Sequence, residues 1–248
     1  MARIVSIANQ KGGVGKTTTA INLASGLAKA GKRCLVIDID PQCNATSGLG
    51  LKPAERHPLL ANRPLSESLQ PTVTPGLSVL VGSQSLTDAD ALSASNRQRA
   101  ALLKQQLSNG LGKYDYVLMD CPPSLGQLTR AALAAAHEVL IPIQCEYFAM
   151  EGLSQIVELV RQIKGRDNRQ LEVGGILLTM FDAQLELAHD VAEEVRRHFE
   201  ETVFRTMIPR DVEISEAPSH GLSVIDYAPR ARGTRAYVEL CMEVMDRE

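Results

Sequence analysis

The stretch from Asn9 to Ala24 reads NQKGGVGKTTTAINLA, and it contains the pattern that decides the fold. An apolar run, Ile4–Ala8, leads into it, and a helix-like pattern over Thr17–Ala30 follows it. The glycines between them lack Cβ atoms, so their backbone N–H groups can turn inward and approach an anion closely. Because the glycine-rich loop opens a helix directly after a strand, we interpret it as a phosphate-binding loop rather than as a chance turn.

This loop differs from the usual pattern G-x-x-x-x-G-K-[ST] at one position, because Gln10 replaces the first glycine. Lys16 is expected to place its charge on the β- and γ-phosphates of a nucleotide, and the Thr17 hydroxyl can ligate Mg²⁺. The following helix would direct the positive end of its dipole at the same anion. A second lysine, Lys11, could add charge to the phosphate cage, reach outward to a neighbouring active site, or remain a solvated loop lysine.

The composition is that of a globular protein, with 248 residues, 44% of them hydrophobic and 22% charged. This length fits one large domain over residues 1–248. The net charge of −3 and the absence of Trp disfavour a global basic field or a stacking platform for nucleic acid. The five cysteines lack metal-site spacing, so we expect a reduced, cytoplasmic compartment. No signal peptide or membrane span is recognisable, and no membrane partner is expected.

Apolar runs alternate with helical patterns along most of the chain, which predicts an α/β fold with a doubly wound, mostly parallel sheet flanked by helices. The expected strands are Ile4–Ala8, Cys34–Ile39, Leu77–Val81, Tyr116–Met119, Val139–Ile143, Ile176–Met180 and Thr206–Ile208. The expected helices are Thr17–Ala30, Arg97–Asn109, Leu125–Ala136, Met150–Lys164, Leu185–Phe199 and Thr234–Met245. The proline-containing stretch Lys52–Pro75 has no clear rhythm, and we interpret it as a surface excursion rather than a domain linker.

Two carboxylates follow predicted strands and would face the loop. Asp40 comes after Cys34–Ile39, at the strand end that points into the ligand crevice of a parallel sheet. It is a candidate to orient the attacking water, although a cap or turn role is the alternative; Asp38 would support it. Asp120 follows four apolar positions in a Walker B pattern, which places a carboxylate near Mg²⁺. Cys121 has no His near it in sequence, so we interpret it as a packed or neutral thiol rather than a nucleophile.

The loop string KGGVGKTT resembles the deviant Walker A motif of the ParA/MinD class of P-loop ATPases. The match continues through DPQCNATSGLG, DCPPSLG, IPIQCEYFAMEGLSQ, IPR and SEAPSHG, in the order of the chromosomal ParA (Soj-like) proteins, over nearly the whole chain. The resemblance implies an ATPase that needs ATP and Mg²⁺, forms a homodimer when ATP is bound, and turns over slowly without a stimulating, ParB-like partner. It also implies that Lys11 crosses the dimer interface to touch the nucleotide of the partner subunit.

The loop pattern and the resemblance together give a set of candidate site residues. The catalytic candidates are Lys11, Lys16 and Asp40, and the metal candidates are Thr17, Asp40 and Asp120. The candidates for binding the phosphates are Lys11, Gly12, Gly13, Val14, Gly15, Lys16, Thr17 and Thr18. By resemblance, the loops after two late strands hold adenine, and their candidates are Met180, Pro209, Arg210 and Asp211. From the sequence alone, a methionine at position 180 is more often a core residue than a ligand contact.

Three positions depart from the Soj-like pattern, which carries basic residues where this chain has Gln184, Glu213 and Leu222. In the family such residues contribute to non-specific DNA binding, so we expect this binding to be weakened. Association with the nucleoid would depend on it. For each of the remaining basic candidates, a solvated helix face is at least as good an interpretation as a DNA contact; they are Arg161, Lys164, Arg166, Arg169, Arg196, Arg197, Arg205, Arg230, Arg232 and Arg235.

Other members of the same class remain as alternatives. A MinD-like, membrane-cycling ATPase would need a basic amphipathic tail, whereas the ending AYVELCMEVMDRE is largely acidic on its polar face. A nitrogenase-type reductase or iron–sulfur carrier would need paired cysteine ligands, which the spacing does not provide. An amidating synthetase on the same scaffold is the third alternative. A tyrosine autokinase would carry a C-terminal tyrosine cluster, but Tyr227 and Tyr237 stand apart.

Overall fold

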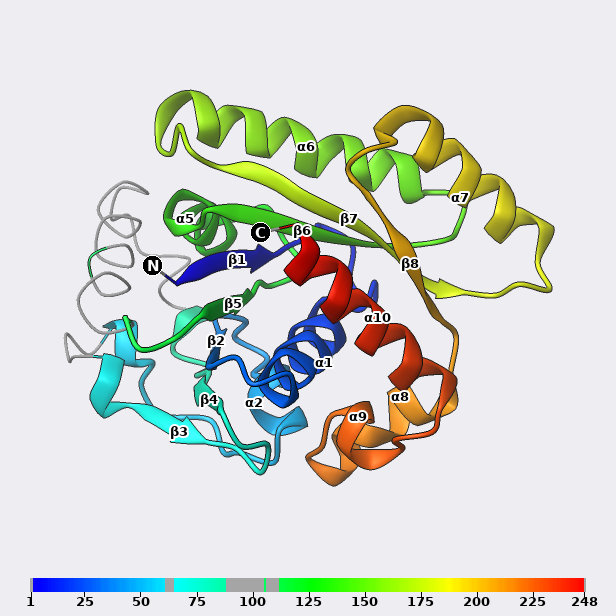
Figure 1. Cartoon of the computed structure of the whole chain (residues 1–248). Helices are drawn as coiled ribbons and strands as arrows, with labels where there is room; N and C mark the ends of the chain where they lie inside the picture. Colours follow the sequence, from blue (N-terminus) through cyan, green and yellow to red (C-terminus); the bar gives the residue numbers. More distant parts are fainter. Residues whose placement is uncertain (1, 61–64, 88–104, 106–111, 248) are drawn as a thin grey trace.

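One sheet organises the part of the chain that the computed structural model describes, residues 2–60, 65–87, 105 and 112–247 (Figure 1). Its eight strands are β1 (Arg3–Ile7), β2 (Cys34–Asp38), β3 (Leu69–Pro71), β4 (Leu77–Leu80), β5 (Tyr116–Asp120), β6 (Glu138–Gln144), β7 (Glu172–Phe181) and β8 (Val203–Pro209). They lie in the order β3-β4-β2-β5-β1-β6-β7-β8. All neighbouring pairs are parallel except β3 and β4, which are antiparallel.

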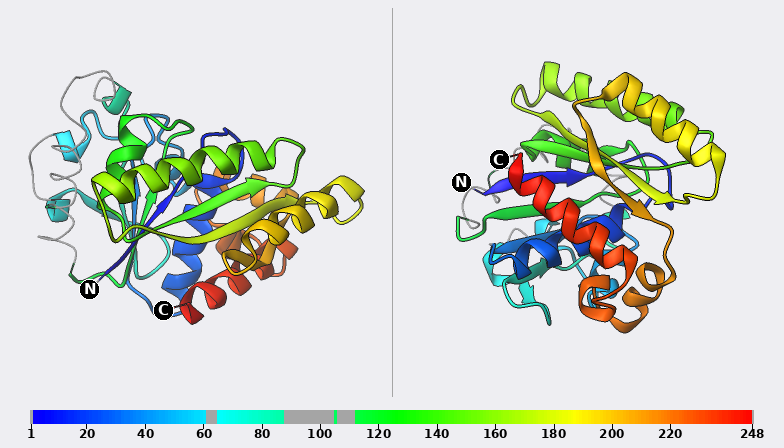
Figure 2. Two further views of the ribbon diagram at one scale, coloured as in Figure 1. Left: turned by 90° about the horizontal axis from the view of Figure 1, so that it is seen from above. Right: turned by 45° about the vertical axis from the view of Figure 1, so that its right-hand side comes forward.

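Helices cover both faces of this sheet (Figure 1, Figure 2). One face carries α5 (Gln127–Ala135), α6 (Ala149–Arg166) and α7 (Glu186–Phe199), and the other carries α1 (Lys16–Lys29) and α10 (Arg232–Asp246). Three short helices lie beside α1 and α10, namely α2 (Asn44–Gly48), α8 (Val212–Glu216) and α9 (Val224–Tyr227). The predicted α/β fold, with a doubly wound and mostly parallel sheet, is confirmed.

The central strands are buried on both faces, which explains why their sequences read as continuous apolar runs. Every residue of β2 and β5 is buried. Because successive side chains point to opposite faces, Leu35 and Ile37 lie in the apolar cluster on the face that α5, α6 and α7 cover, whereas Cys34 and Val36 lie in the cluster beneath α1 and α10. The sheet thus separates two apolar clusters, and the polar chemistry is left to the ends of the strands.

Two neighbouring strands, β7 and the edge strand β8, are longer than the sequence predicted, and β7 begins at Glu172 rather than at Ile176. The pattern predicted a strand only over Thr206–Ile208, whereas β8 contains seven residues. Arg205 is exposed and Thr206 is partly buried, because an edge strand is less covered than a central one. Arg205 therefore interrupts the apolar run, and the pattern indicated only the part of the strand after it. The predicted helix Arg97–Asn109 lies outside the described residues, apart from Gln105.

The stretch Lys52–Pro75, predicted to be a surface excursion, contributes a short strand to the sheet. It contains two 3₁₀ turns, Pro58–Leu60 and Leu65–Glu67, and then β3, which pairs with β4 at the sheet edge. Sequence periodicity could not reveal β3, because a three-residue strand that ends in proline has no alternating pattern. The short helices α2, α8 and α9 escaped prediction for the same reason of length.

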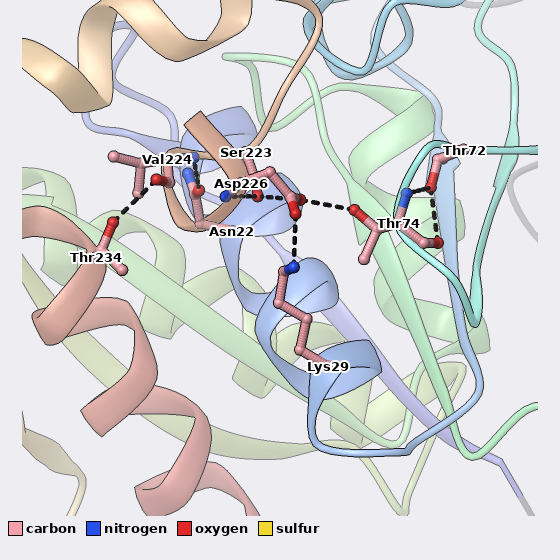
Figure 3. Close-up of polar contacts among 8 residues, drawn as sticks. All are labelled: Asn22, Lys29, Thr72, Thr74, Ser223, Val224, Asp226 and Thr234. Carbon is pink, nitrogen blue, oxygen red and sulfur yellow. Dashed lines mark hydrogen bonds and ion pairs between the residues drawn. The ribbon is translucent and has the colours of Figure 1, made fainter. Parts of the chain in front are cut away.

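The helix that begins at the phosphate loop is fastened to distant segments through Asp226 (Figure 3). This carboxylate accepts hydrogen bonds from the hydroxyls of Thr74 at 2.7 Å and Ser223 at 2.8 Å, and it pairs with Lys29 at 2.6 Å. Burial would raise the pKa of Asp226, but these partners outweigh burial and lower it. The end of α1, the β3–β4 hairpin and α9 are therefore joined by one ionised group.

A second polar connection joins the middle of α1 to the C-terminal segments (Figure 3). The buried Asn22 accepts a hydrogen bond from the Val224 amide at 2.7 Å. Thr234 of α10 donates to the carbonyls of Val224 and Ala228, at 2.9 and 2.7 Å. These contacts hold α9 between two long helices. Within the described residues, no helix is both long enough and apolar enough to cross a bilayer.

Candidate functional site

The candidate site lies where β1, β2 and β5 end at the same edge of the sheet. Ile7, the last residue of β1, pairs with Asp120, and Asp120 in turn pairs with Asp38 of β2. The glycine-rich loop leaves β1 at this level and enters α1 at Lys16. Parallel strands therefore bring the loop and the predicted carboxylates together, as expected for a ligand crevice at the carboxyl edge of such a sheet.

Two glycines give the loop its shape. Gly13 and Gly15 have φ angles of 73° and 86°, in the left-handed region where a side chain would be strained. Gly12 and Gly13 are exposed, whereas Val14 is only 1% exposed, so Val14 could contact a ligand only through its backbone. Thr18 is partly buried in the first turn of α1. The loop thus presents backbone groups rather than side chains, except for its lysines.

Lys16 lies inside the loop. Its Nζ donates to the Lys11 carbonyl at 2.9 Å, and its side chain is largely buried. Burial lowers the pKa of Lys16, and nearby carboxylates, Asp120 before Asp40, offset only part of that shift. An ammonium that is already desolvated interacts more strongly with an anion than one at the surface, because less water screens it.

The Thr17 hydroxyl donates to Asp120 Oδ2 at 2.8 Å. The other oxygen of this fully buried carboxylate, Oδ1, has no hydrogen-bond partner in the structure. A threonine hydroxyl and an unpartnered carboxylate oxygen are hard oxygen donors, as Mg²⁺ prefers. Among the described residues, no group of three or more His, Cys, Asp or Glu side chains is arranged to hold a metal ion. Thr17 and Asp120 therefore fit an ion that takes its other ligands from water or phosphate.

Asp120 and Asp38 form a buried pair of carboxylates. Burial, and then the charge of Asp38, raise the pKa of Asp120 well above its ordinary value. Burial raises the pKa of Asp38 to about 6, even though hydrogen bonds from Thr46 work in the opposite direction. Two like charges in a dry environment disfavour each other's ionised form. This pair is costly for folding near neutral pH, which is typical of a site built to receive a cation.

Asp38 fixes the segment that carries Asp40. Its carboxylate accepts from the Thr46 amide at 2.8 Å, from the Thr46 hydroxyl at 2.6 Å and from the Asp40 amide at 3.2 Å. A Cβ on Gly82 would lie 2.9 Å from the same carboxyl group, so the close approach requires glycine. These contacts hold the Asp40 backbone in place, and a supporting role for Asp38 in the reaction stays a prediction. The sequence did not single out Thr46, because a threonine in a polar string gives no local signal.

Asp40 is 4% exposed, and its Oδ1 accepts a hydrogen bond from the Gln42 amide at 2.9 Å. This contact is the turn role that the sequence left open as an alternative, and it leaves the placement of Asp40 beside the loop intact. Cys43, three residues on, has a φ of 57°, which costs a non-glycine residue roughly 1–2 kcal/mol. Strain of this kind persists where the surroundings over-determine the backbone, and it clusters at switch regions.

The Lys11 side chain reaches the segment between β6 and α6. Its Nζ lies 2.9 Å from Glu146 Oε2, and the two side chains are 38% and 47% exposed. An ion pair this exposed contributes about 0–1 kcal/mol, so another partner can replace it. Tyr147 and Phe148 follow, 77% and 62% exposed, and their rings meet edge to face. Exposed aromatics beside a replaceable lysine pair are typical of a surface that another molecule covers.

The two loops predicted to hold adenine lie side by side. Phe181 pairs with Pro209, and the Arg210 amide donates to the Phe181 carbonyl at 3.0 Å. Met180 has a φ of 51°, a strain of roughly 1–2 kcal/mol for a side chain of this size. Its side chain is only partly buried, so it is not a simple core residue.

Asp211 has a second role that the sequence did not reveal. Its Oδ1 accepts from the Glu213 amide at 3.2 Å and caps α8, while its Oδ2 accepts from the Gly233 amide at 2.7 Å in α10. Burial would raise the pKa of Asp211, but these hydrogen bonds outweigh it and lower the pKa. Both carboxylate oxygens are therefore engaged in holding two helices, and a nucleotide would have to share them.

Cys121 is buried, and so are the other four cysteines. Burial, and then the charge of Asp120, raise the pKa of the Cys121 thiol. A thiol that resists ionisation is a poor nucleophile, which agrees with the interpretation as a packed thiol. The buried Asn9 was also missed by the sequence. It donates to the Pro142 carbonyl at 2.7 Å and accepts from the Lys11 amide at 3.1 Å, and so ties the start of the loop to β6.

The three positions at which the sequence departs from the Soj-like pattern lie at or near the surface. Gln184 and Glu213 are exposed, and Leu222 is partly buried. Several remaining basic side chains already have acidic partners: Lys164 with Glu172, Arg161 with Glu158, and Arg197 with Glu193 and Glu194. Each such pair reduces the positive charge available to a polyanion.

The carboxylate pair predicts an unusual dependence of stability on pH. A carboxylate whose pKa is raised by folding stabilises the fold below its unfolded-state pKa, about 3.9, and this stabilisation is lost as pH rises through the folded-state pKa. Asp120→Asn should therefore raise the unfolding free energy at pH 7 but not at pH 4. Urea unfolding of the ligand-free protein across this range measures the effect. Parallel profiles for variant and wild type would contradict the assigned burial cost.

Comparisons with known proteins agree with this arrangement. A family model described as an AAA domain matches residues 2–173. The chromosome partitioning protein ParA of Myxococcus xanthus (strain DK1622) is 47% identical over 253 residues, which cover 100% of this chain and 89% of that protein. The sporulation initiation inhibitor protein Soj of Bacillus subtilis (strain 168) is 45% identical, and the match covers 98% of each.

Solved structures show the same architecture. Cobyrinic acid a,c-diamide synthase from Mycobacterium smegmatis, with bound ADP and magnesium, has a TM-score of 0.83 at 33% identity, over 99% of this chain and 94% of that one. The septum site-determining protein MinD of Pyrococcus horikoshii, complexed with Mg-ADP, has a TM-score of 0.79 at 24% identity, over 98% and 96%, which shows the fold alone. On its full-length similarity to ParA and Soj, the chain belongs to the ParA/Soj family of P-loop proteins with the deviant Walker A loop.

Proposed function

We propose that residues 1–248 form a single ATPase domain that switches between nucleotide states and positions a chromosome, plasmid or other cargo. The observation that carries this proposal is the orphaned, buried oxygen of Asp120 beside Thr17, at the foot of a glycine loop that contains Lys16. The proteins similar to this chain include chromosome-partitioning ATPases, and neighbours of similar structure bind ADP and magnesium. These features together support hydrolysis of ATP to ADP and phosphate.

Each candidate residue has a physical part in this reaction. The backbone N–H groups of Gly12 to Gly15 and the start of α1 cradle the phosphates, and Lys16 places its charge on the β- and γ-phosphates. Thr17 and Asp120, with Asp40 close by, would hold Mg²⁺, which supplies charge neutralisation to the phosphates. Asp40 accepts a hydrogen bond from the attacking water and aims its oxygen at the γ-phosphorus. Met180, Pro209, Arg210 and Asp211 border the adenine.

The second lysine gives the reaction its dependence on a dimer. In a face-to-face homodimer, Lys11 exchanges Glu146 for the nucleotide of the partner subunit, and the exposed aromatics beside it become covered. A cation supplied by another subunit is worth roughly 10³–10⁵ in rate, so the monomer hydrolyses ATP slowly. A ParB-like partner that stimulates turnover would then reset the switch. We place the protein in the cytoplasm.

A second candidate function is amide synthesis on the same scaffold. It is favoured by the 33% identity to a cobyrinic acid a,c-diamide synthase over nearly the whole chain. ATP turnover that depends strictly on a carboxylic acid and an amine donor would favour this alternative. The 47% identity to ParA of Myxococcus xanthus favours the partition function.

The proposal predicts that Lys16→Ala abolishes ATP binding without unfolding the protein, because the phosphates lose the buried cation of the loop. Titration calorimetry with ATP and Mg²⁺ measures the affinity, and circular dichroism checks the fold. Lys52→Ala, at an exposed position outside the loop, is the matched control and should bind as the wild type does. A folded Lys16→Ala protein with near-native affinity would rule the proposal out.

Lys11 and Asp40 should separate dimer formation from hydrolysis. Lys11→Ala should keep most of its ATP affinity but lose ATP-dependent dimerisation and turnover, because the trans cation is gone. Asp40→Ala should accumulate as an ATP-bound dimer that does not hydrolyse. Light scattering and phosphate release measure the two properties. If Asp40→Ala stayed monomeric with ATP and Mg²⁺ while the wild type dimerised, the role assigned to Asp40 would be wrong.

Binding of non-specific DNA is proposed to be weak, because the positions of Gln184, Glu213 and Leu222 lack the positive charge of related proteins. Each phosphate that a basic residue neutralises contributes about −0.9 to the slope of log K against log salt. Gln184→Arg with Glu213→Arg should therefore tighten ATP-dependent DNA binding and steepen that slope. Fluorescence anisotropy over a salt series measures both.

The control for this test changes the same residue types elsewhere. Gln170→Arg with Glu201→Arg changes the net charge by the same amount. These exposed residues precede β7 and β8, whereas Gln184 and Glu213 follow them, so the two pairs lie at opposite ends of the strands. This control pair should leave the affinity for DNA nearly unchanged. Tight wild-type binding at physiological salt, with no gain from the first pair, would contradict the assignment.

A further inference from the structure

We propose that Thr179 is a positioning residue for the phosphate loop, which it holds so that the Gly15 N–H group faces bound phosphate. The proposal rests on the nucleotide binding proposed above and concerns a residue that does not itself touch the phosphates. Thr179 belongs to β7, whereas the loop follows β1, and β6 lies between these two strands. The contact therefore reaches the loop from two strands away.

The Thr179 side chain bridges the loop and the sheet. Its Oγ1 lies 2.9 Å from the Val14 carbonyl oxygen and 3.0 Å from the Ile143 carbonyl oxygen, so its one proton can serve either acceptor. The residue is 2% exposed. Its own carbonyl accepts from the Cys145 amide at 3.3 Å, and the residue pairs with Gln144 in the β6–β7 ladder. The sheet thus holds Thr179 in place independently of its contact with the loop.

The geometry of the peptide unit turns this hydrogen bond into an orientation of the loop. In a planar trans peptide, the C=O and the following N–H point in opposite directions. Because the Val14 carbonyl faces Thr179, the Gly15 N–H points away from Thr179, and bound phosphate would lie on that side. Gly15 has a φ of 86°, and a Cβ there would lie 3.7 Å from the Thr179 methyl carbon, so Gly15 lies beside this side chain.

The residue after Thr179 extends the argument to the base. Met180 has a φ of 51°, a conformation that a non-glycine residue keeps only where its surroundings fix it. Thr179 supplies one such restraint directly before the strained residue. A single point at the end of β7 therefore fixes both the orientation of the phosphate loop and the start of the loop proposed to border the adenine.

The test compares three variants with the wild type. Thr179→Val keeps the shape but removes the hydroxyl, and Thr179→Ser keeps the hydroxyl but removes the methyl. Thr234→Val is the matched control, because Thr234 is also buried and also donates to two carbonyls, but it lies in α10. ADP with Mg²⁺ is the probe, since ADP avoids both hydrolysis and the ATP-dependent dimer.

Titration calorimetry with ADP should show affinity weakened roughly tenfold in Thr179→Val, as expected for one lost buried hydrogen bond. Thr179→Ser and Thr234→Val should stay within about twofold of the wild type. In ¹H–¹⁵N spectra, the Gly15 amide should shift strongly on ADP addition in the wild type and in Thr179→Ser, but much less in Thr179→Val. Thermal unfolding without ligand should show Thr179→Val and Thr234→Val destabilised alike.

Other results would overturn the proposal. If Thr179→Val bound ADP like the wild type while its melting temperature fell, Thr179 would be merely structural. If Thr179→Ser lost as much affinity as Thr179→Val, packing of the methyl would be responsible rather than the hydroxyl. If Thr179→Val did not fold, Thr179→Ala would be judged by the same criteria. A wild type that fails to bind ADP would overturn the proposed function itself, which distinguishes the two failures.

Discussion

The buried carboxylate of Asp120 is the constraint around which the rest of the site is arranged. One oxygen receives the Thr17 hydroxyl, the other has no partner, and a second buried carboxylate, Asp38, lies beside it across the β2–β5 pairing. Without a cation this arrangement costs free energy, because like charges are held in a dry environment. The strand register imposes that cost, and the same register aims the donors at the position where a cation bound to phosphate would lie.

The two loop lysines differ in burial, and this difference gives them different chemistry. Lys16 is buried and bonded to the loop itself, so it acts at a fixed point. Lys11 is on the rim, with an exposed and weakly bound partner in Glu146, so it can change partners at little cost. One short string of sequence thus contains one lysine that is fixed in place and one that can change partners. The neighbouring exposed aromatics make the rim a surface suited to association.

The C-terminal third of the chain supports the site more than it enters it. Asp211 holds the starts of α8 and α10, and Asp226 ties α9 to the far end of α1. At Gly221, a Cβ would lie 2.7 Å from the Gly50 Cα, so two glycines allow the C-terminal segment to pack against the segment after α2. These contacts fix the helix that begins at the phosphate loop, although most of them lie far from it.

The sequence by itself determined the parallel α/β fold, the glycine loop with Lys16 and Thr17, and the strand-end carboxylates Asp40 and Asp120. These features are local: a strand, a turn and a helix follow one another within one short window, and periodicity reveals them. Only the tertiary structure decided that Lys11 pairs with Glu146, that Thr179 holds Val14, and that Asp211 is a double cap. The first two contacts join residues 135 and 165 positions apart. Such partners depend on which strands are neighbours and in what register, and no local pattern encodes that.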